Sequence, residues 1–259
     1  MKSYLTTEPR VRHLSYSDLT FSDPNPIKRY LQRSRLTHAM KMARRVPAPR
    51  TVLDFGAGNG ELCKYLRPAF PHARILCYEP APHLLEQARE NLRSTEGIDL
   101  VGDLDAVEPG SVDLAFSLEV FEHLPPRETA DAFARIGGLL SPDGHLIVGV
   151  PVEVGVPALY KGVFRMIRRY GAFDATVTNV LACVIGRPPL ARPRLEMAAG
   201  LHYHLAHVGF DHRRFRSLLS ESFKVEALAA TPWPVLGTAL NPEVYYLVAP
   251  AGTPVRQAA

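Results

Sequence analysis

The stretch TVLDFGAGNGEL, residues 51–62, decides the fold class. A short apolar run is interrupted by Asp54 and leads into three glycines, Gly56, Gly58 and Gly60, after which a helical pattern begins. Alternate glycines permit a tight turn and allow a ligand to approach the backbone closely. A strand, a glycine-rich turn and a helix in this order are typical of the ligand-binding edge of a parallel α/β sheet.

The carboxylates around this turn indicate which ligand it suits. Dinucleotide sites space their glycines as G-x-G-x-x-G and hold a pyrophosphate at the helix N-terminus. Here the spacing is one residue shorter, with Asp54 just before the turn and Glu61 just after it. Two carboxylates would repel a pyrophosphate, whereas they suit a ligand that carries an ammonium and a sulfonium group.

Strands alternate with helices along the middle of the chain. Strands are predicted at residues 50–55, 73–79, 98–103, 112–119 and 145–151, and helices at 61–70, 81–94 and 127–140. Residues 141–144, SPDG, are predicted to be a turn before the fifth strand. This alternation predicts a doubly wound, Rossmann-like and mostly parallel α/β sheet. A helix at 211–222 precedes two strands, 223–230 and 243–250, that form an antiparallel hairpin at the sheet edge.

Acidic residues close three successive predicted strands. Asp54 ends the first, Glu79 the second and Asp103 the third. Glu79 stands where a carboxylate chelates the two hydroxyls of a ribose, and Asp103 where one accepts a hydrogen bond from an exocyclic amine. Because the carboxyl ends of parallel strands share one edge of the sheet, the three acids are expected to surround one ligand.

Four segments together resemble class I S-adenosylmethionine-dependent methyltransferases, in particular the type 11, ubiquinone-pathway-like small-molecule group. They are VLDFGAGNGELCKYL (52–66), CYEPAPHLLEQARENL (77–92), VGDLDAVEPGSVDLAFSLEVFEHLP (101–125) and IGGLLSPDGHLIVGVP (136–151). The resemblance covers roughly residues 50–151, with a weaker match at 207–249. It implies a seven-stranded sheet in the order 3-2-1-4-5-7-6 with strand 7 antiparallel, N-terminal helices and an inserted lid.

The resemblance also implies a role for each cofactor-binding residue. The three glycines let the methionine part of S-adenosylmethionine approach the backbone, and Asp54 lies near its amino group. Glu79, followed by Pro80, holds the ribose. Four further residues complete this set: Asp103 and Leu104 flank the adenine, and Ser117 and Leu118 line the floor under the sulfonium.

A second motif, LEVFEHL, follows the fourth predicted strand. Glu119, Glu122 and His123 stand at i, i+3 and i+4, which places them on one face if the segment is helical. The ExxEH pattern is similar to the metal motif of ubiquinone-pathway O-methyltransferases and of small-RNA 3′-terminal 2′-O-methyltransferases. Two carboxylates and an imidazole would suit Mg²⁺, Mn²⁺ or Zn²⁺. Alternatively, His123 is a catalytic base or a substrate contact without a metal.

Four histidines cluster later in the chain, in HYHLAHVGFDH. They are His202, His204, His207 and His212. They fall in or next to the segment that should cover the acceptor pocket, and His207 precedes the last predicted helix. His207 is therefore a candidate fourth metal ligand or catalytic base, while loop histidines without a role are the alternative.

Residues 157–171, PALYKGVFRMIRRYG, form a predicted basic amphipathic helix. Its apolar side chains recur at helical spacing, and its lysine and arginines lie mainly on the other side. Three arrangements remain open: a helix packed on the core, a lid over the acceptor pocket, or a helix that lies on an anionic membrane. RNA is a less favoured partner, because no basic segment rich in aromatic residues is present for base stacking.

Charge and composition set the remaining expectations. Residues 1–50 carry 11 basic and 3 acidic side chains, residues 51–150 carry 7 and 16, and residues 151–259 carry 12 and 7. The acidic middle of the chain suits a cationic cofactor, and the basic flanks suit an anionic partner. Three cysteines without paired spacing, no apolar leader and no long apolar run predict a cytoplasmic protein that could touch a membrane.

The organisation predicted from these patterns has five parts. They are a basic helical cap at 1–49, a cofactor-binding core at 50–151, an inserted lid at 152–206, a C-terminal helix and edge strands at 207–250, and a tail at 251–259. The predicted activity is S-adenosylmethionine-dependent O- or N-methylation of a small-molecule or lipid-linked acceptor. The alternatives are a metal-dependent RNA 2′-O-methyltransferase and a non-catalytic S-adenosylmethionine-binding protein.

Overall fold

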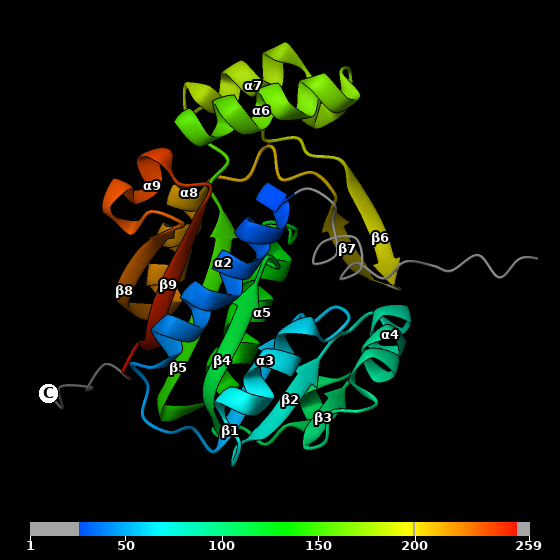
Figure 1. The fold of residues 1–259 in the computed structure, drawn as a ribbon, viewed down its shortest axis with the longest axis vertical. Coiled ribbons are helices and arrows are strands. Elements are labelled where there is room, and N and C mark those ends of the chain that lie inside the picture. The colour runs from blue at the N-terminus through cyan, green and yellow to red at the C-terminus, as the bar shows by residue number, and fades with distance from the viewer. Residues whose placement is uncertain (1–25, 199, 253–259) are drawn as a thin grey trace, which may run out of the picture.

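A seven-stranded sheet forms the centre of the molecule in a computed structural model that describes residues 26–198 and 200–252 (Figure 1). Its strands are β1 Thr51–Phe55, β2 Arg74–Tyr78, β3 Ile98–Val101, β4 Val112–Leu118, β5 Leu140–Pro151, β8 Phe223–Thr231 and β9 Glu243–Pro250. The order is β3-β2-β1-β4-β5-β9-β8. β1 to β5 pair in parallel, and β9 runs antiparallel to β5 and β8. The predicted fold class and strand order are therefore confirmed.

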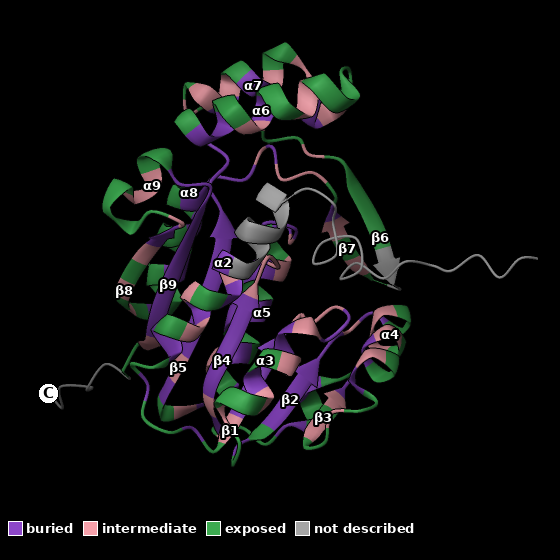
Figure 2. Ribbon diagram, in the orientation of Figure 1, coloured by how far each residue is buried: buried purple, intermediate pink, exposed green. Residues whose placement is uncertain are grey.

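Helices cover both faces of this sheet. The helices are α2 Pro26–Ala43, α3 Glu61–Ala69, α4 Pro82–Leu92, α5 Pro126–Leu139, α6 Val156–Arg169, α7 Val177–Val184, α8 His212–Ser222 and α9 Gly237–Leu240. Buried residues of α2, α3 and α4 form one core with the sheet, and those of α5 and α8 form another on the opposite face. The central strands β1, β2, β4 and β9 are mostly buried, whereas the edge strands β3 and β8 are partly exposed (Figure 2). A sheet buried on both faces requires the continuous apolar strands that the sequence shows.

The predicted SPDG turn lies within β5 rather than before it. Leu140 already pairs with Val112, and the ladder resumes where His145 pairs with Leu114. The intervening residues 141–144 bulge from the strand, and a side chain at Gly144 would approach the Val112 carbonyl oxygen within 2.7 Å. The turn residues therefore interrupt the strand without ending it, because pairing with β4 holds both of their ends.

The segment between β5 and α8 lies beyond the carboxyl ends of the parallel strands. It contains α6 and α7, joined through the short 3₁₀ turn η2 Phe173–Ala175, and the two-stranded sheet of β6 Arg194–Ala198 and β7 Leu201–His204. Figure 1 shows α6 and α7 stacked above the sheet, with the β6–β7 hairpin descending beside them. This segment therefore overhangs the edge where ligands of such sheets bind. No helix within the described ranges is long and apolar enough to cross a bilayer.

The contact between α6 and α7 depends on the absence of a side chain at Gly162. A Cβ atom there would overlap the side chain of Val180, which is buried on α7. Gly138 of α5 offers a contrast, since a Cβ there would meet nothing within 4 Å. Gly138 therefore only lowers the stability of its helix, whereas Gly162 is needed for the close contact between α6 and α7.

We expect Gly138→Ala to stabilise the protein by about 0.5–1 kcal/mol, because alanine favours the helix. Gly162→Ala should instead destabilise it by about 1–3 kcal/mol, because the added methyl group overpacks the α6–α7 contact. Chemical denaturation of both variants measures the difference. Equal stabilisation by the two substitutions would contradict the close packing of α6 on α7.

Candidate functional site

The glycine turn after β1 has the backbone geometry that only glycine adopts without strain. The φ angles of Gly56, Gly58 and Gly60 are 76°, 55° and 76°. A Cβ atom at Gly56 would lie 2.6 Å from Val120, and one at Gly60 would lie 2.7 Å from Leu92. A Cβ at Gly58 would meet nothing within 4 Å, so this glycine faces open space. The turn is packed on two sides and accessible at its centre.

Glu79 fixes this turn from the neighbouring strand. Its carboxylate accepts hydrogen bonds from the backbone N–H groups of Gly58 and Ala81, each at 2.9 Å. The carbonyl of Tyr78 accepts from the N–H groups of Gly56 and Ala57, also at 2.9 Å. Burial raises the pKa of Glu79, against the lowering effect of these hydrogen bonds. The end of β2 and the turn after β1 therefore form one hydrogen-bonded unit.

Asp54 lies beneath the turn and is almost completely buried. Its carboxylate accepts a hydrogen bond from the thiol of Cys63 on α3, at 3.4 Å. Burial raises the pKa of Asp54 to about 7, and the hydrogen bond opposes this shift. A cationic group bound nearby would favour the ionised carboxylate and lower that pKa.

The other predicted cofactor residues lie along the same edge. Asp103 accepts from the N–H of Asp105 at the start of the 3₁₀ turn η1 Leu104–Ala106, and its side chain is 70% exposed. Leu104 is buried, and the buried hydroxyl of Ser117 has no hydrogen-bond partner in the described chain. Pro80 and Leu118 are half-buried. All these residues follow or end β2, β3 and β4, but Asp103 points to solvent and also pairs with Arg135.

The segment LEVFEHL is a turn and not a helix, which corrects the expectation of a shared helical face. β4 ends at Leu118, and Glu119 adopts a φ of 58°. The N–H groups of His123 and Leu124 then donate to carbonyls three residues earlier, which closes two tight turns. α5 begins only at Pro126, in keeping with a proline's preference for the first turn of a helix.

This turn separates the two glutamates. Glu119 pairs with Arg35 of α2, at 3.2 Å, and the same guanidinium contacts Glu243 at the start of β9. Burial raises the pKa of Glu119 to about 7, although Arg35 opposes the shift. Glu119 is therefore engaged with α2, whereas Glu122 faces the histidines.

Glu122, His123 and His207 form a compact cluster. One oxygen of Glu122 lies 3.7 Å from Nε2 of His123 and 3.9 Å from Nε2 of His207. Glu122 is fully buried, and neither of its carboxylate oxygens has a hydrogen-bond partner in the described chain. One ligand atom from each residue lies within 4.8 Å of the others. The structure thus brings together three of the predicted metal or catalytic residues and leaves Glu119 outside.

All three groups of this cluster favour their neutral forms. Burial raises the pKa of Glu122 well above its usual range, and the nearby Glu119 adds to the shift. Burial lowers the pKa of His123 to about 4 and that of His207 well below its usual range. The short distances between carboxyl and imidazole groups are therefore contacts between neutral groups rather than ion pairs.

The backbone of β7 orients His123. Nδ1 of His123 donates to the carbonyl of His204 at 2.7 Å, while the His204 N–H donates to the His123 carbonyl at 2.8 Å. The ring of Tyr203 stacks on the imidazole at a centroid distance of 4.2 Å. A neutral imidazole that donates from Nδ1 presents a lone pair on Nε2. This lone pair points toward Glu122.

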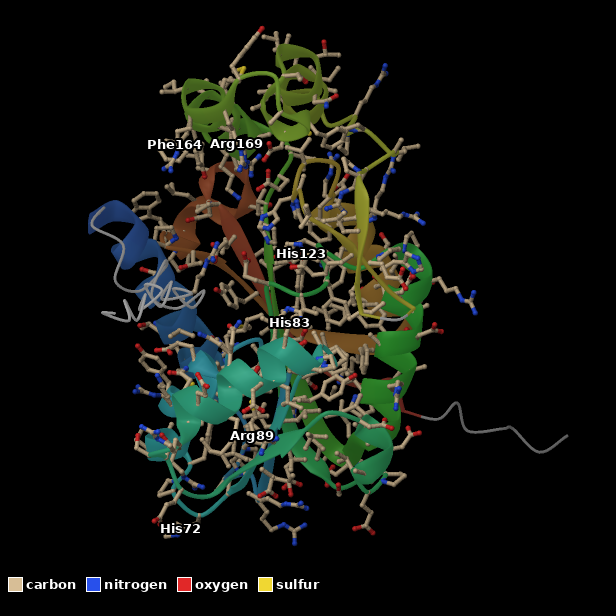
Figure 3. All side chains as sticks on the ribbon, turned by 90° about the vertical axis from the view of Figure 1, so that its right-hand side faces the viewer. His72, His83, Arg89, His123, Phe164 and Arg169 are labelled. Atoms are coloured by element: carbon tan, nitrogen blue, oxygen red, sulfur yellow. The ribbon has the colours of Figure 1, made fainter. Side chains whose placement is uncertain are left out.

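Of the four clustered histidines, only the His207 side chain joins Glu122 and His123. His202 is half exposed and lies 3.8 Å from Glu128. Nδ1 of His204 bonds to the Pro193 carbonyl, and His212 is buried at the start of α8. In Figure 3, His123 lies below Phe164 and Arg169 of α6 and above His83 of α4. The cluster therefore lies between the overhanging helices and the glycine-turn edge.

A basic pocket of about 380 Å³ borders the cluster on the α6 side. Its lining residues are Arg35, Glu153, Lys161, Phe164, Arg165, Arg168, Arg169 and His207. Glu153 is buried and accepts from Lys161 at 3.0 Å and from Arg165 at 2.7 and 2.8 Å. Although burial alone would raise the pKa of Glu153, these two cations hold it well below its usual range. Five of the lining side chains are cationic, and four of them have acidic partners: Lys161 and Arg165 pair with Glu153, Arg35 with Glu119 and Glu243, and Arg169 with Asp174.

Sequence reasoning missed several of these residues. Arg35 lies on α2, which is distant in sequence from the other residues of the site. Arg192 lies in a loop and donates to the carbonyls of Glu122 and Ala206. Glu153 follows β5 closely, as Glu79 follows β2. Glu153 could have been predicted as a site residue, because it follows a predicted strand as the other acids do.

The sequence of this chain is similar to those of known methyltransferases. A family profile described as a methyltransferase domain matches residues 53–146. Trans-aconitate 2-methyltransferase of Methylobacterium radiotolerans is 28% identical over 213 residues, which cover 80% of this chain and 76% of that protein. Malonyl-[acyl-carrier protein] O-methyltransferase of Geobacter sulfurreducens is 36% identical over 129 residues, 48% of each chain. This chain therefore spans only about half of the second relative.

Solved structures extend the likeness to the whole fold. PH0226 protein of Pyrococcus horikoshii superimposes with a TM-score of 0.57 at 14% identity, covering 90% of this chain and 95% of the other. The N-methyltransferase NodS of Bradyrhizobium japonicum, solved with S-adenosylhomocysteine, gives 0.54 at 15% identity, covering 93% and 95%. The solved structures show the fold, and the family profile and the curated relatives support a class I S-adenosylmethionine-dependent methyltransferase.

Proposed function

We propose that this protein transfers the methyl group of S-adenosylmethionine to a carboxylate oxygen of an anionic small molecule. The observation that carries the proposal is the basic pocket beside His207, which five cationic side chains line; they outnumber the four acids that pair with them, Glu119, Glu153, Asp174 and Glu243. An acceptor with one or more free carboxylates would complement this charge. A basic pocket next to the carboxyl edge of the sheet would hold such an acceptor close to the donor.

The curated relatives support this acceptor class. One is named for trans-aconitate, which carries three carboxylates, and the other for malonyl groups on acyl-carrier protein, which carry one free carboxylate. Both names describe acceptors that are anionic at neutral pH. We extend only this shared chemistry to the present chain.

The donor would lie on the glycine turn. Gly58 faces open space there, and Glu79 has its carboxylate beside the turn. We assign Glu79, followed by Pro80, to the ribose, Asp54 to the amino group, Asp103 and Leu104 to the adenine, and Ser117 and Leu118 to the floor beneath the sulfonium. The buried hydroxyl of Ser117, which has no partner in the described chain, fits a position against a ligand.

The chemistry requires orientation more than proton transfer. Methyl transfer is an in-line displacement on a carbon that the sulfonium already activates, so the protein contributes by placing the acceptor oxygen. A carboxylate acceptor arrives deprotonated and needs no base. His123, with a pKa of about 4, is a weak base. We therefore assign His123 and His207 to positioning the acceptor beside the basic pocket.

The direct test uses methyl-labelled S-adenosylmethionine and a small-molecule extract. We expect label in acidic metabolites and its release as methanol in mild alkali, because methyl esters hydrolyse there while methyl ethers and N-methyl groups do not. Alkali-stable label would overturn the carboxylate acceptor. Tight donor binding with no labelled product would indicate a non-catalytic binding protein instead.

The donor site has a separate test in Glu79→Gln. The amide keeps the shape but replaces a charge-assisted acceptor of two backbone N–H groups, so the dissociation constant for S-adenosylmethionine should rise roughly 10- to 100-fold. Calorimetric titration measures this change, with NAD as a second ligand. The matched control is Glu86→Gln, an exposed acid on α4. Unchanged affinity in Glu79→Gln would remove Glu79 from the donor site.

A second candidate function, metal-dependent methyl transfer, is favoured by Glu122. Its carboxylate is fully buried with both oxygens unpaired in the described chain, beside Nε2 of His123 and the ring of His207. One carboxylate and two imidazoles fit Zn²⁺ or Mn²⁺, with positions left for further ligands. A metal bound there would act as a Lewis acid toward an acceptor oxygen. RNA 2′-O-methylation belongs to this candidate alone.

Glu122→Gln tests how much the unpaired carboxylate lowers the free energy of unfolding. A raised pKa means that the folded protein holds a proton that the unfolded chain releases above pH 4.5. The free energy of unfolding should therefore fall as the pH rises from that value toward the pKa of the folded state, by about 1.4 kcal/mol for each pH unit, and the amide should remove this loss. In thermal melting from pH 5 to about 8, the melting temperature of the variant should rise relative to that of the wild type. Glu108→Gln, at an exposed position, is the control.

The same variant separates the two candidates. If a metal binds, the wild type should take up Co²⁺ with a visible absorption band, and Glu122→Gln should lose it. Metal-dependent transfer also requires activity to fall after chelation. Full activity without metal, together with no Co²⁺ binding, would dismiss this second candidate and leave the first intact.

A further inference from the structure

The apolar stripe of α6 faces solvent. Its side chains recur at helical spacing: Val156, Leu159, Tyr160, Val163, Phe164 and Ile167, followed by Tyr170. Each is more than 40% exposed, and Ile167 and Tyr170 reach 80% and 73%. The buried side of the helix consists of the small residues Pro157, Ala158 and Gly162. The helix therefore packs through its small side chains and leaves its large apolar side chains uncovered by the described chain.

Exposed apolar side chains are concentrated at this end of the molecule. Of the 20 large hydrophobic residues that are exposed in the described chain, 11 lie in residues 155–193 and four in residues 233–240. The second group is Trp233, Val235, Leu236 and Leu240, of which Val235 is 94% exposed. Scattered single residues of this kind are normal on a protein surface, but a contiguous apolar area marks an interaction surface.

The two groups adjoin each other. The hydroxyl of Tyr160 on α6 donates to the carbonyl of Leu240 on α9, at 3.2 Å. Tyr160 and Leu240 are themselves exposed members of the two groups. We call the exposed apolar residues of α6 and of residues 233–240, together with Tyr170, the α6 face. In Figure 2, α6 and α7 project beyond the sheet with much of their surface exposed.

The exposed charge next to this face is basic. Residues 155–193 contain six basic side chains and a single acid, Asp174; two of the six, Lys161 and Arg165, are largely buried against Glu153. Asp174 is buried and paired with Arg169 and Arg165. The guanidinium of Arg168 lies 5.4 Å from the ring centroid of Phe164, at the border of the apolar stripe. The partner of the α6 face should therefore be apolar inside and negatively charged at its surface.

We propose that the α6 face docks the protein on an anionic lipid membrane. A bilayer combines an apolar interior, which would take Ile167 and Val235, with an anionic headgroup layer that would face Arg168 and Arg169. The exposed tyrosine and tryptophan side chains of the face suit the boundary between these layers. Phe164 also lines the basic pocket, so docking would bring the pocket next to the headgroups. The inference does not depend on which acceptor is methylated.

Vesicle sedimentation of the full chain tests the proposal. We expect binding to vesicles that contain phosphatidylglycerol and little binding to pure phosphatidylcholine, with binding reduced by high salt. The double variant Ile167→Gln/Tyr170→Gln should reduce partitioning at least about tenfold, because two exposed apolar side chains leave the bilayer. Both residues are exposed and neither lines the pocket, so folding and donor binding should persist.

The matched control is Leu195→Gln/Leu218→Gln, which changes exposed leucines on β6 and α8. This control should bind vesicles like the wild type. Failure of the wild type to bind anionic vesicles, or equal loss in the two double variants, would overturn the proposal. Self-association of the wild type that Ile167→Gln/Tyr170→Gln abolishes, without vesicle binding, would assign the face to a second copy of the chain instead.

Discussion

The hydrogen bond from the Gly58 N–H to the Glu79 carboxylate connects the first two strands at the edge where the site lies, and the Ala81 N–H holds the other carboxylate oxygen. A glycine turn alone has many accessible conformations, since glycine adopts either sign of φ with little steric cost. An acceptor that is anchored at the end of β2 selects one of them. The cost is a buried carboxylate with a raised pKa, which a bound ribose would offset through hydrogen bonds of its own. The same residue therefore shapes the turn and would contact the cofactor.

The core of the fold could be predicted because its signals are local. Continuous apolar strands, glycines at alternate positions and an acid after each strand are features of short segments, and the sheet buries both faces as such strands require. Glu79 and the glycine turn lie where the sequence places them. The helical assumption for Glu119, Glu122 and His123 failed because a positive φ at Glu119 and two tight turns precede α5. Nothing in the spacing of these residues distinguishes a helix from consecutive turns.

The rest of the site depends on contacts between distant segments. Arg35 on α2 reaches Glu119 and Glu243, and the β7 backbone holds His123 through His204. Such pairs depend on how α2 and the overhanging segment pack against the sheet, and no periodicity in the sequence predicts them. The histidine cluster is a partial exception: His207 stands out in the sequence because it precedes the last predicted helix, and of the four clustered histidines its side chain is the one that reaches Glu122. Its contact with Glu122 could not be predicted, because the two residues lie in distant segments.

Charge explains why the donor and acceptor parts of the molecule differ so strongly. Asp54 and Glu79 are buried acids with raised pKa values, and such groups gain most from a bound cation. Glu153 is the opposite case, since Lys161 and Arg165 already satisfy it. The five cations that line the basic pocket outnumber their acidic partners and would suit an anionic acceptor, whereas Asp54 at the glycine turn would suit the amino group of the donor. Because α6 contributes both cations and Phe164 to the basic pocket and also carries the exposed apolar stripe, its orientation couples the basic pocket to whatever surface the stripe contacts.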